Sequence, residues 1–226
     1  MKHVLDRPIW SALESAHSHL AEGNENARRY PPSIVPFAAS ADDRPESLDA
    51  LEALPALEES MILVEAGPIV IPAGLAVVAE ASLVQMIAER PHGRISDSRI
   101  EPLTEADAAD MLALATLTKP GPFTLRAQSL GSFWGIRSNG RLVAMAGQRM
   151  RQSGFIELSG LCTHPDFQGR GFGTLLFRFV AGEIASSGDT AYLHAYASNI
   201  SAISLYKTQG FALRSEMNMR AVKRRS

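Results

Sequence analysis

Apolar and polar positions in the second half of the chain repeat with two different periods. Helical spacing predicts a helix over 174–186, where Leu175, Leu176, Phe179, Val180 and Ile184 share one side. By the same reasoning, further helices are predicted over 104–118, 125–130 and 201–209, and strands over 99–103, 133–137, 142–149, 155–162, 191–197 and 211–221. Strands interspersed with helices indicate an α/β or α+β layered domain.

The first half of the chain has a less regular pattern. Helices are predicted over 9–20 and 83–89, strands over 61–64 and 75–79, and irregular structure over 24–49, which is rich in proline and polar residues. The polar, glycine-containing stretch 91–97 indicates a boundary. We therefore expect two parts, an N-terminal α/β region over 1–95 that packs on a second domain over 96–226.

A glycine-rich turn joins the strand predicted over 155–162 to the helix that follows it. Glycine lets backbone N–H groups approach a ligand closely, and the helix directs its positive end into the same space. This combination favours a bound pyrophosphate. The phosphate loop of NTPases is excluded because no Gly-Lys-Ser or Gly-Lys-Thr is present here, and the dinucleotide fingerprint is excluded because Thr174 stands where its third glycine belongs.

Two motifs in order carry a family resemblance. Gln168, Gly171 and Gly173 fill the pattern Q-x-x-G-x-G, and Asn199-x-x-Ala202-x-x-Leu205-Tyr206-x-x-x-Gly210-Phe211 follows about thirty residues later. Together they resemble the GNAT superfamily of N-acetyltransferases over 99–222. The run Glu-x-Ser-Gly-x-Cys-Thr-His-Pro looks like the C-terminal half of glycine N-acyltransferase. The resemblance implies a mixed, mostly antiparallel central sheet flanked by helices, with acetyl-CoA as cosubstrate and no metal.

The resemblance also implies which residues hold coenzyme A. The pyrophosphate would meet the main chain of Gln168, Gly169, Arg170, Gly171, Phe172, Gly173 and Thr174. The pantetheine arm would pair with Leu161, Cys162 and Thr163, and the second motif would add Asn199, Ala202 and Tyr206. Gly160 lies inside the preceding strand, where glycine is typical of a bulge or of close backbone approach.

Two residues are candidates for proton transfer. Glu157 is an acid in an apolar strand, where desolvation would raise its pKa and suit a general base; the alternative is a solvated strand-end glutamate. Tyr206 stands where the family has its general acid; the alternative is a core tyrosine. Cys162 reads as a small buried residue rather than a nucleophile. His194 is either a core histidine or a residue on the acceptor side.

Composition and charge narrow the class of protein. A single cysteine excludes an intramolecular disulfide and suits a reducing cytoplasm. The longest apolar run, 67–79, contains two prolines and is too short to span a bilayer, and no secretory leader is recognisable. From Arg137 onward there are twelve Lys and Arg against five acids, which suits a polyanionic ligand such as coenzyme A. No motif points to nucleic acid.

We therefore expect a cytoplasmic acyltransferase that moves an acetyl group from acetyl-CoA to a primary amine by direct attack in a ternary complex. A small-molecule acceptor is favoured. Two alternatives stay open: a non-catalytic acyl-CoA-binding regulator, and an acetyltransferase of protein lysines or N-termini. The resemblance is compatible with a homodimer. The first half is expected to help form the acceptor site because its apolar runs need cover.

Overall fold

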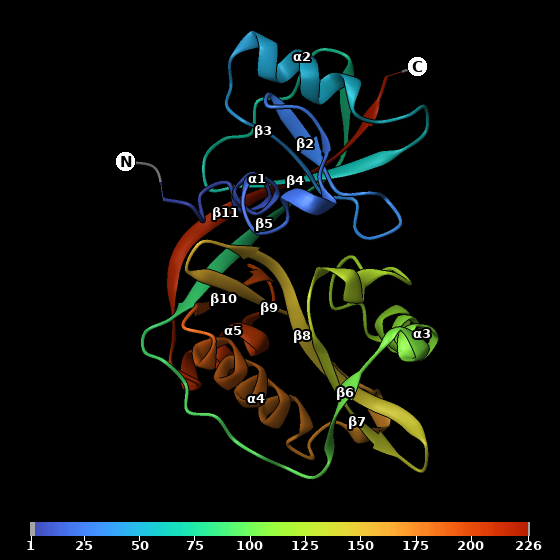
Figure 1. The fold of residues 1–226 in the computed structure, drawn as a ribbon, viewed down its shortest axis with the longest axis vertical. Coiled ribbons are helices and arrows are strands. Elements are labelled where there is room, and N and C mark those ends of the chain that lie inside the picture. The colour runs from blue at the N-terminus through green and yellow to red at the C-terminus, as the bar shows by residue number, and fades with distance from the viewer. Residues whose placement is uncertain (1–2, 226) are drawn as a thin grey trace.

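The computed structural model describes residues 3–225 and has an N-terminal part stacked on a larger second part (Figure 1). The N-terminal part, at the top of Figure 1, contains two helices, a 3₁₀ turn and a small antiparallel sheet: α1 (Pro8–Glu14), η1 (Ser18–Leu20), β1 (Glu22–Gly23), β2 (Ala27–Arg29), β3 (Ala38–Ser40) and α2 (Pro45–Ala53).

An eight-stranded sheet runs through both parts in the order β4-β11-β5-β10-β9-β8-β7-β6. Its strands are β4 (Ser60–Glu65), β5 (Leu75–Ala88), β6 (Ile100–Leu103), β7 (Phe133–Ser138), β8 (Arg141–Gln152), β9 (Phe155–Thr163), β10 (Thr190–Tyr196) and β11 (Phe211–Arg224). Only β9 and β10 pair in parallel among these described neighbours. The predicted mixed, mostly antiparallel sheet is confirmed.

Helices cover both faces of this sheet in the second part. The remaining helical segments are η2 (Glu105–Asp107), α3 (Ala108–Thr118), η3 (Ala127–Leu130), η4 (Pro165–Phe167), α4 (Phe172–Ser186) and α5 (Ile200–Thr208). Helix α4 packs Phe177 and Val180 in one core with Val143 of β8. Helix α3 packs Met111 in another core with Leu142 of β8. Since successive residues of a strand point to opposite faces, the two helices lie on opposite sides of β8.

The prediction of a helix over 83–89 is wrong. These residues continue β5, which pairs with β10 on one side and with β11 on the other. Met86, for example, faces Leu193 of β10 and Leu213 of β11. Leucine, glutamine and methionine favour helices locally, but pairing with a strand on each side overrides that preference.

The first ninety residues hold more regular structure than their pattern predicts. The stretch 24–49, predicted to be irregular, contains β2, β3 and the start of α2. The single helix predicted over 9–20 is divided into α1 and η1. Strands β2 and β3 have three residues each, which is too short for an alternation of polar and apolar residues to be recognised. Pro45 does not interrupt α2, because it stands at the first position of the helix, where its missing N–H costs nothing.

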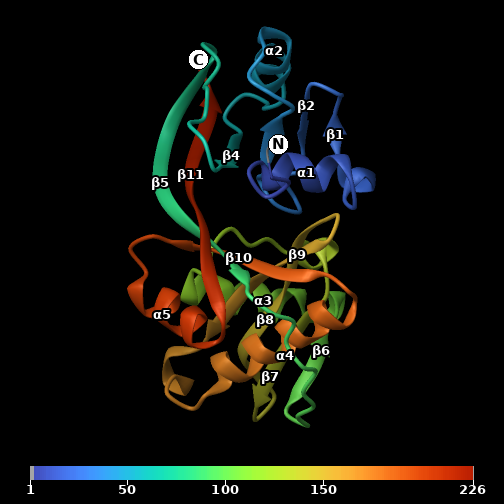
Figure 2. The ribbon, with the colours of Figure 1, turned by 90° about the vertical axis from the view of Figure 1, so that its left-hand side faces the viewer.

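The long strands β5 and β11 join the two parts of the molecule. Figure 2 shows them side by side from top to bottom, and their ladder extends from Phe211 opposite Ala88 to Arg224 opposite Leu75. The C-terminal half of β5 lies between β10 and β11, so residues before 95 complete the sheet of the second part. The division into 1–95 and 96–226 stays a prediction.

Candidate functional site

Strands β9 and β10 separate after a short parallel contact. They pair only where Phe155–Glu157 face Thr190–Tyr192. Beyond that point β9 stays with β8 and β10 stays with β5. Gly160 has a φ of +64°, and the register of β8 against β9 shifts across it, so the predicted bulge is confirmed. A Cβ at Gly160 would lie 2.8 Å from Phe133 Cε1, so a side chain there would displace the Phe133 ring and strain the backbone.

The glycine-rich turn begins α4 without a side-chain cap. Gly169 and Gly171 have φ values of +75° and +77°, in the left-handed region that favours glycine. No acid stands in the first turn of α4, and a Cβ built on Gly169 or Gly171 would meet only open space. The first N–H groups of the helix are therefore accessible, which fits the pyrophosphate of a coenzyme A molecule.

The end of β9 lies against the start of α4. A Cβ on Gly173 would be 3.5 Å from Thr163 Oγ1. Cys162 points the other way and is only 8% exposed, packed with Met111 and Met145. Burial raises the pKa of its thiol to about 11, so the interpretation of Cys162 as a small buried residue holds. Leu161, by contrast, lines a pocket at the opening between β9 and β10.

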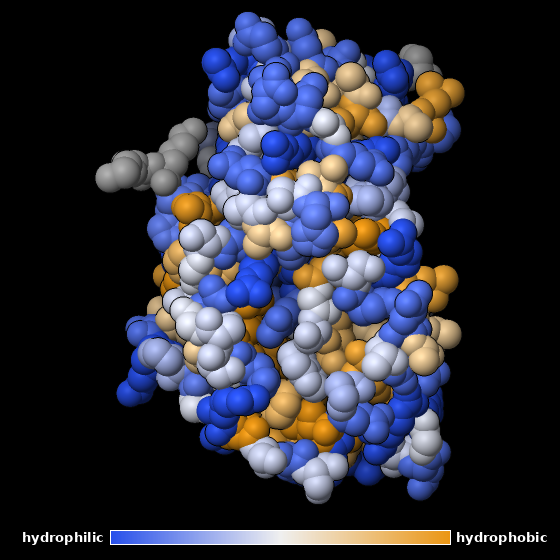
Figure 3. Space-filling model, viewed as in Figure 1, coloured by the Kyte–Doolittle hydropathy of each residue, from blue (hydrophilic) through white to orange (hydrophobic). Residues whose placement is uncertain are grey.

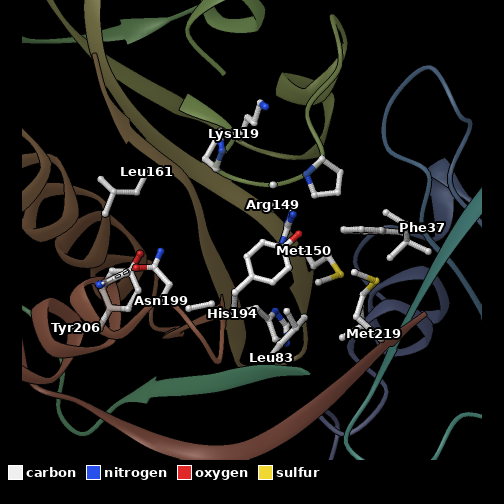
Figure 4. Close-up of a pocket in the computed structure, with 18 residues that line it drawn as sticks. Phe37, Leu83, Lys119, Arg149, Met150, Leu161, His194, Asn199, Tyr206 and Met219 are labelled. Atoms are coloured by element: carbon white, nitrogen blue, oxygen red, sulfur yellow. Dashed lines mark hydrogen bonds between the residues drawn. The ribbon is translucent and has the colours of Figure 1, made fainter. Parts of the chain in front are cut away.

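This pocket has two ends of different character and encloses about 160 Å³. At one end lie Leu161, Asn199 and Tyr206, and at the other lie Phe37, Met150 and Met219, with Arg149 and His194 between them (Figure 4). The remaining lining residues are Ile62, Val64, Leu83, Lys119, Pro120, Gly121, Pro122, Ala195, Tyr196 and Ala202. Phe37, Ile62, Val64 and Leu83 belong to the N-terminal region.

Helix α5 positions Tyr206 at the first end of the pocket. Asn199 caps this helix, because its Oδ1 accepts a hydrogen bond of 3.2 Å from Ala202 N. The Tyr206 ring stacks on Phe177, with centroids 5.3 Å apart. Burial raises the pKa of Tyr206 above its ordinary value of 10, so the phenol keeps its proton at neutral pH.

Glu157 is fully buried behind the pocket and is paired. Arg149 donates to it from Nε at 2.8 Å and from Nη2 at 2.6 Å, and His194 Nδ1 lies 2.8 Å from its Oε1. Burial alone would raise the pKa of Glu157, but the charge of Arg149 and the hydrogen bonds from Arg149 and His194 lower it to about 2. The prediction of a raised pKa for Glu157 is wrong.

The same polar network determines the hydrogen-bonding roles of the two His194 ring nitrogens. Gln85 Nε2 donates to Leu5 O at 3.0 Å and lies 2.9 Å from His194 Nε2, while Arg214 Nε donates to Gln85 Oε1. The Gln85 amide must therefore point its N–H at His194 Nε2. His194 Nε2 therefore accepts from Gln85, and the Nδ1–H donates a hydrogen bond to Glu157 Oε1. The network extends across β8, β9, β10, β5 and β11.

The pattern of the sequence did not identify Arg149 or Gln85. The sequence does show Arg149 and Glu157 as charged residues of opposite sign in two consecutive predicted strands that are otherwise mostly apolar. Opposite charges on neighbouring strands attract each other when both are buried. Gln85 gave no signal because it fell in a segment predicted as helix.

Comparison with known proteins identifies the family. The FR47-like protein family matches residues 133–221. A crystal structure from Novosphingobium aromaticivorans DSM 12444, assigned to the GNAT family of acetyltransferases, is 40% identical, covers 100% of both chains and superposes with a TM-score of 0.93. A GCN5-related N-acetyltransferase from Kribbella flavida shares the fold at 14% identity, covering 96% of this chain and 93% of its own, with a TM-score of 0.61. No curated protein matches.

The chain belongs to the GNAT family of acetyltransferases. Members of this family are acyltransferases that use acetyl-CoA as cosubstrate and amines as acceptors. The resemblance seen in the two sequence motifs is thereby confirmed at the level of the family and of its fold.

Two features are absent from the described residues, 3–225. No helix among them is long and apolar enough to cross a bilayer. No group of three or more His, Cys, Asp or Glu side chains among them is arranged to hold a metal ion.

Proposed function

We propose that this protein transfers the acetyl group of acetyl-CoA to the primary amine of a small molecule, by direct attack in a ternary complex. The observation that carries the proposal is the opening between β9 and β10. The start of α4, which has no side-chain cap, follows β9 in the chain, and Leu161 of β9 lines the pocket that contains Tyr206. A donor could thus lie with its phosphates at one end and its thioester at the other.

The proposed donor site uses the residues identified from the motifs. Gln168 to Thr174 would hold the pyrophosphate through main-chain N–H groups, with Arg170 adding a charge at the exposed turn. Leu161, Cys162 and Thr163 would pair with the pantetheine arm, because the inner edge of β9 is not paired with β10 beyond Glu157. Asn199, Ala202 and Tyr206 would bound the thioester end, where they line the pocket.

The proposed chemistry assigns the last proton transfer to Tyr206. The amine nitrogen forms a bond to the thioester carbon, and the carbon–sulfur bond then breaks. Tyr206 gives its phenolic proton to the leaving thiolate and recovers a proton from solvent. A main-chain N–H of Leu161 to Thr163 would stabilise the oxyanion. The proton lost by the amine goes to water in the pocket.

In this proposal Glu157 is a positioning residue and not the general base that its place in the strand first suggested. Both of its oxygens already accept hydrogen bonds from Arg149, and one also accepts from His194. A carboxylate held in this way is a weak base with no oxygen free for the acceptor. We assign Glu157 the task of holding Arg149 and His194 in place. A base role would instead give Glu157→Gln a loss of kcat that hydroxide partly restores at high pH.

The experiment that tests the function is a screen for acetyl-CoA-dependent thiol release with amino acids, polyamines, aminoglycosides and peptides. We expect release with one class of amine, an acceptor heavier by one acetyl group in the mass spectrum, and intersecting lines in two-substrate kinetics. Binding of acetyl-CoA without release across the whole panel would contradict the proposal and favour a regulator. Acetylation of proteins alone would contradict the small-molecule acceptor.

A further inference from the structure

The pocket beside Tyr206 is lined, within the part of the chain that the structure describes, by cationic side chains and by no acidic ones. Among the described residues that line it, two are permanent cations, Lys119 and Arg149, and none is an acid. The nearest acid behind the wall, Glu157, is fully buried and already occupied by Arg149 and His194. A substrate with several ammonium groups would find no carboxylate to pair with here. The charges instead suit a ligand that carries a negative group.

Arg149 presents part of its guanidinium to this pocket. It has five N–H donors, and its hydrogen bonds to Glu157 use Nε and Nη2. Among the described residues, no hydrogen-bond acceptor meets its Nη1. The guanidinium also lies over the Phe37 ring, 4.9 Å from the centroid. Arg149 therefore lies between the polar middle of the pocket and its apolar end. Its Nη1 N–H groups remain available to donate hydrogen bonds to a ligand.

The buried network holds this guanidinium in a fixed orientation. Arg149 donates two parallel hydrogen bonds, of 2.8 Å and 2.6 Å, from one edge of its guanidinium to the Glu157 carboxylate. His194, itself oriented by Gln85, fills the remaining lone pair of Glu157 Oε1. A guanidinium positioned beforehand loses little entropy when it binds a carboxylate.

The far end of the pocket is apolar. Phe37, Ile62, Val64, Met150 and Met219 form its wall, and they come from the N-terminal region and from β8 and β11. In Figure 3 the outer surface on this side of the molecule is mainly hydrophilic, with hydrophobic residues between the upper and lower parts. The whole pocket, with its polar middle and the end at Tyr206 included, has a volume of about 160 Å³, and this apolar end is one part of it.

We propose that the acceptor is an amino acid with an apolar side chain, whose carboxylate binds Arg149. Its amine lies toward Tyr206 and Leu161, and its aliphatic or aromatic side chain lies toward Phe37 and Met219. The amine, the carboxylate and the side chain on one α-carbon thus match three regions of the pocket. Figure 4 shows these regions at Tyr206, at Arg149 and at Phe37, in that order. This inference rests on the proposed acetyl transfer and adds the class of acceptor.

The test compares two acceptors of equal size with the wild-type enzyme. L-phenylalanine and L-phenylalaninamide share the amine and the ring, and only the first has a carboxylate. We expect kcat/KM to be about 10- to 100-fold higher for phenylalanine, the range of one hydrogen bond to a charged group. Spermidine, a polyamine, should be acetylated more slowly than either.

A double variant, Arg149→Gln with Glu157→Gln, tests whether Arg149 recognises the carboxylate. Both members of the ion pair are replaced, so that neither charge stays buried without its partner. We expect it to acetylate the two acceptors at similar rates. The matched control is Arg94→Gln with Glu183→Gln, which removes another bidentate pair, with bonds of 2.7 Å and 3.0 Å, on the outer side of α4. That control should keep the wild-type preference. If the first double variant fails to fold, the wild-type ratio alone decides.

The outcomes separate this inference from the proposed function. Equal kcat/KM for the acid and the amide, or a preference for the amide or for spermidine, would overturn the amino-acid inference while leaving acetyl transfer in place. Unchanged discrimination in a folded Arg149→Gln, Glu157→Gln enzyme would also overturn it, because the carboxylate would then be recognised elsewhere. Turnover of no amine at all would remove the proposed function and this inference together.

Discussion

At the scale of single residues, burial has opposite consequences for the two groups suggested for proton transfer. Tyr206 is neutral, so burial raises its pKa and keeps its proton in place. Glu157 is charged, and it stays charged in a buried position because Arg149 and His194 surround it. A buried group that keeps its proton can serve as an acid, whereas a buried carboxylate in an ion pair serves as a support.

Replacement of Tyr206 by phenylalanine should lower kcat by roughly 10²- to 10⁴-fold, the usual contribution of a positioned proton donor. The ring still stacks on Phe177, so the affinity for coenzyme A should change little. The measurement is steady-state thiol release together with calorimetric binding. A donor thioester with a more acidic leaving thiol should reduce the loss. Wild-type turnover in Tyr206→Phe would leave the tyrosine only a packing role.

The lowered pKa of Glu157 makes a prediction about stability. A carboxylate whose folded pKa is lowered from 4.5 to about 2 stabilises the fold above pH 4.5, and this contribution is lost as pH falls toward 2. Glu157→Gln should therefore be less stable than the wild type at pH 7, and the difference in unfolding free energy should shrink below pH 4.5. Urea titrations at several pH values measure it. A difference that stays constant from pH 7 to pH 3 would contradict the assigned pKa.

At the scale of elements, the sequence predicted a helix or strand correctly where the pattern that identifies it lies within the segment itself. Helix α4 and the strands β7 and β8 were predicted because the periodicity that defines each of them lies within its own segment. Strand β5 was missed beyond residue 79 because its partners, β10 and β11, lie more than a hundred residues away. The Arg149–Glu157 pair depends on the register of β8 and β9, which a single sequence does not provide.

The start of α4 allows a matched test of the phosphate site. Gly171→Asp places a negative charge where the helix N-terminus would meet a phosphate, so acetyl-CoA affinity should fall about 10-fold or more. Gly154→Asp is the control, because its φ of +78° equals that of Gly171, +77°, within a degree, and it also faces open space. Calorimetric titration measures both. Equal affinities for the two folded variants would refute a phosphate site at this turn.

At the scale of the whole molecule, the N-terminal region contributes both to the sheet and to the pocket. Strand β5 pairs with β10 and β11, and Phe37, Ile62, Val64 and Leu83 form part of the apolar wall. Arg214 and Gln85 tie the first residues to the second part through Leu5 and Asp6. The apolar end of the pocket is therefore complete only when both parts are present.

A chain that begins at Ile95 should consequently fail to form the native fold. It would lack β5, leaving β10 and β11 without their shared neighbour and exposing the apolar residues that β5 and α1 cover. We expect a loss of the cooperative thermal transition, or aggregation. Circular dichroism melting and size-exclusion chromatography provide the measurement. A monomeric fragment that melts at the full-length temperature and acetylates the same acceptor would show that the N-terminal region is dispensable.

The central claim is that acetyl-CoA lies between β9 and β10, with its phosphates at the start of α4. Backbone hydrogen exchange of the full chain, with and without acetyl-CoA, tests this claim most directly, because the proposed contacts are main-chain N–H groups. The account predicts slower exchange over Gln168–Thr174 and Leu161–Thr163, and little change in α2 and β1–β3. Unchanged exchange in the first two segments, with protection elsewhere at saturating acetyl-CoA, would contradict it.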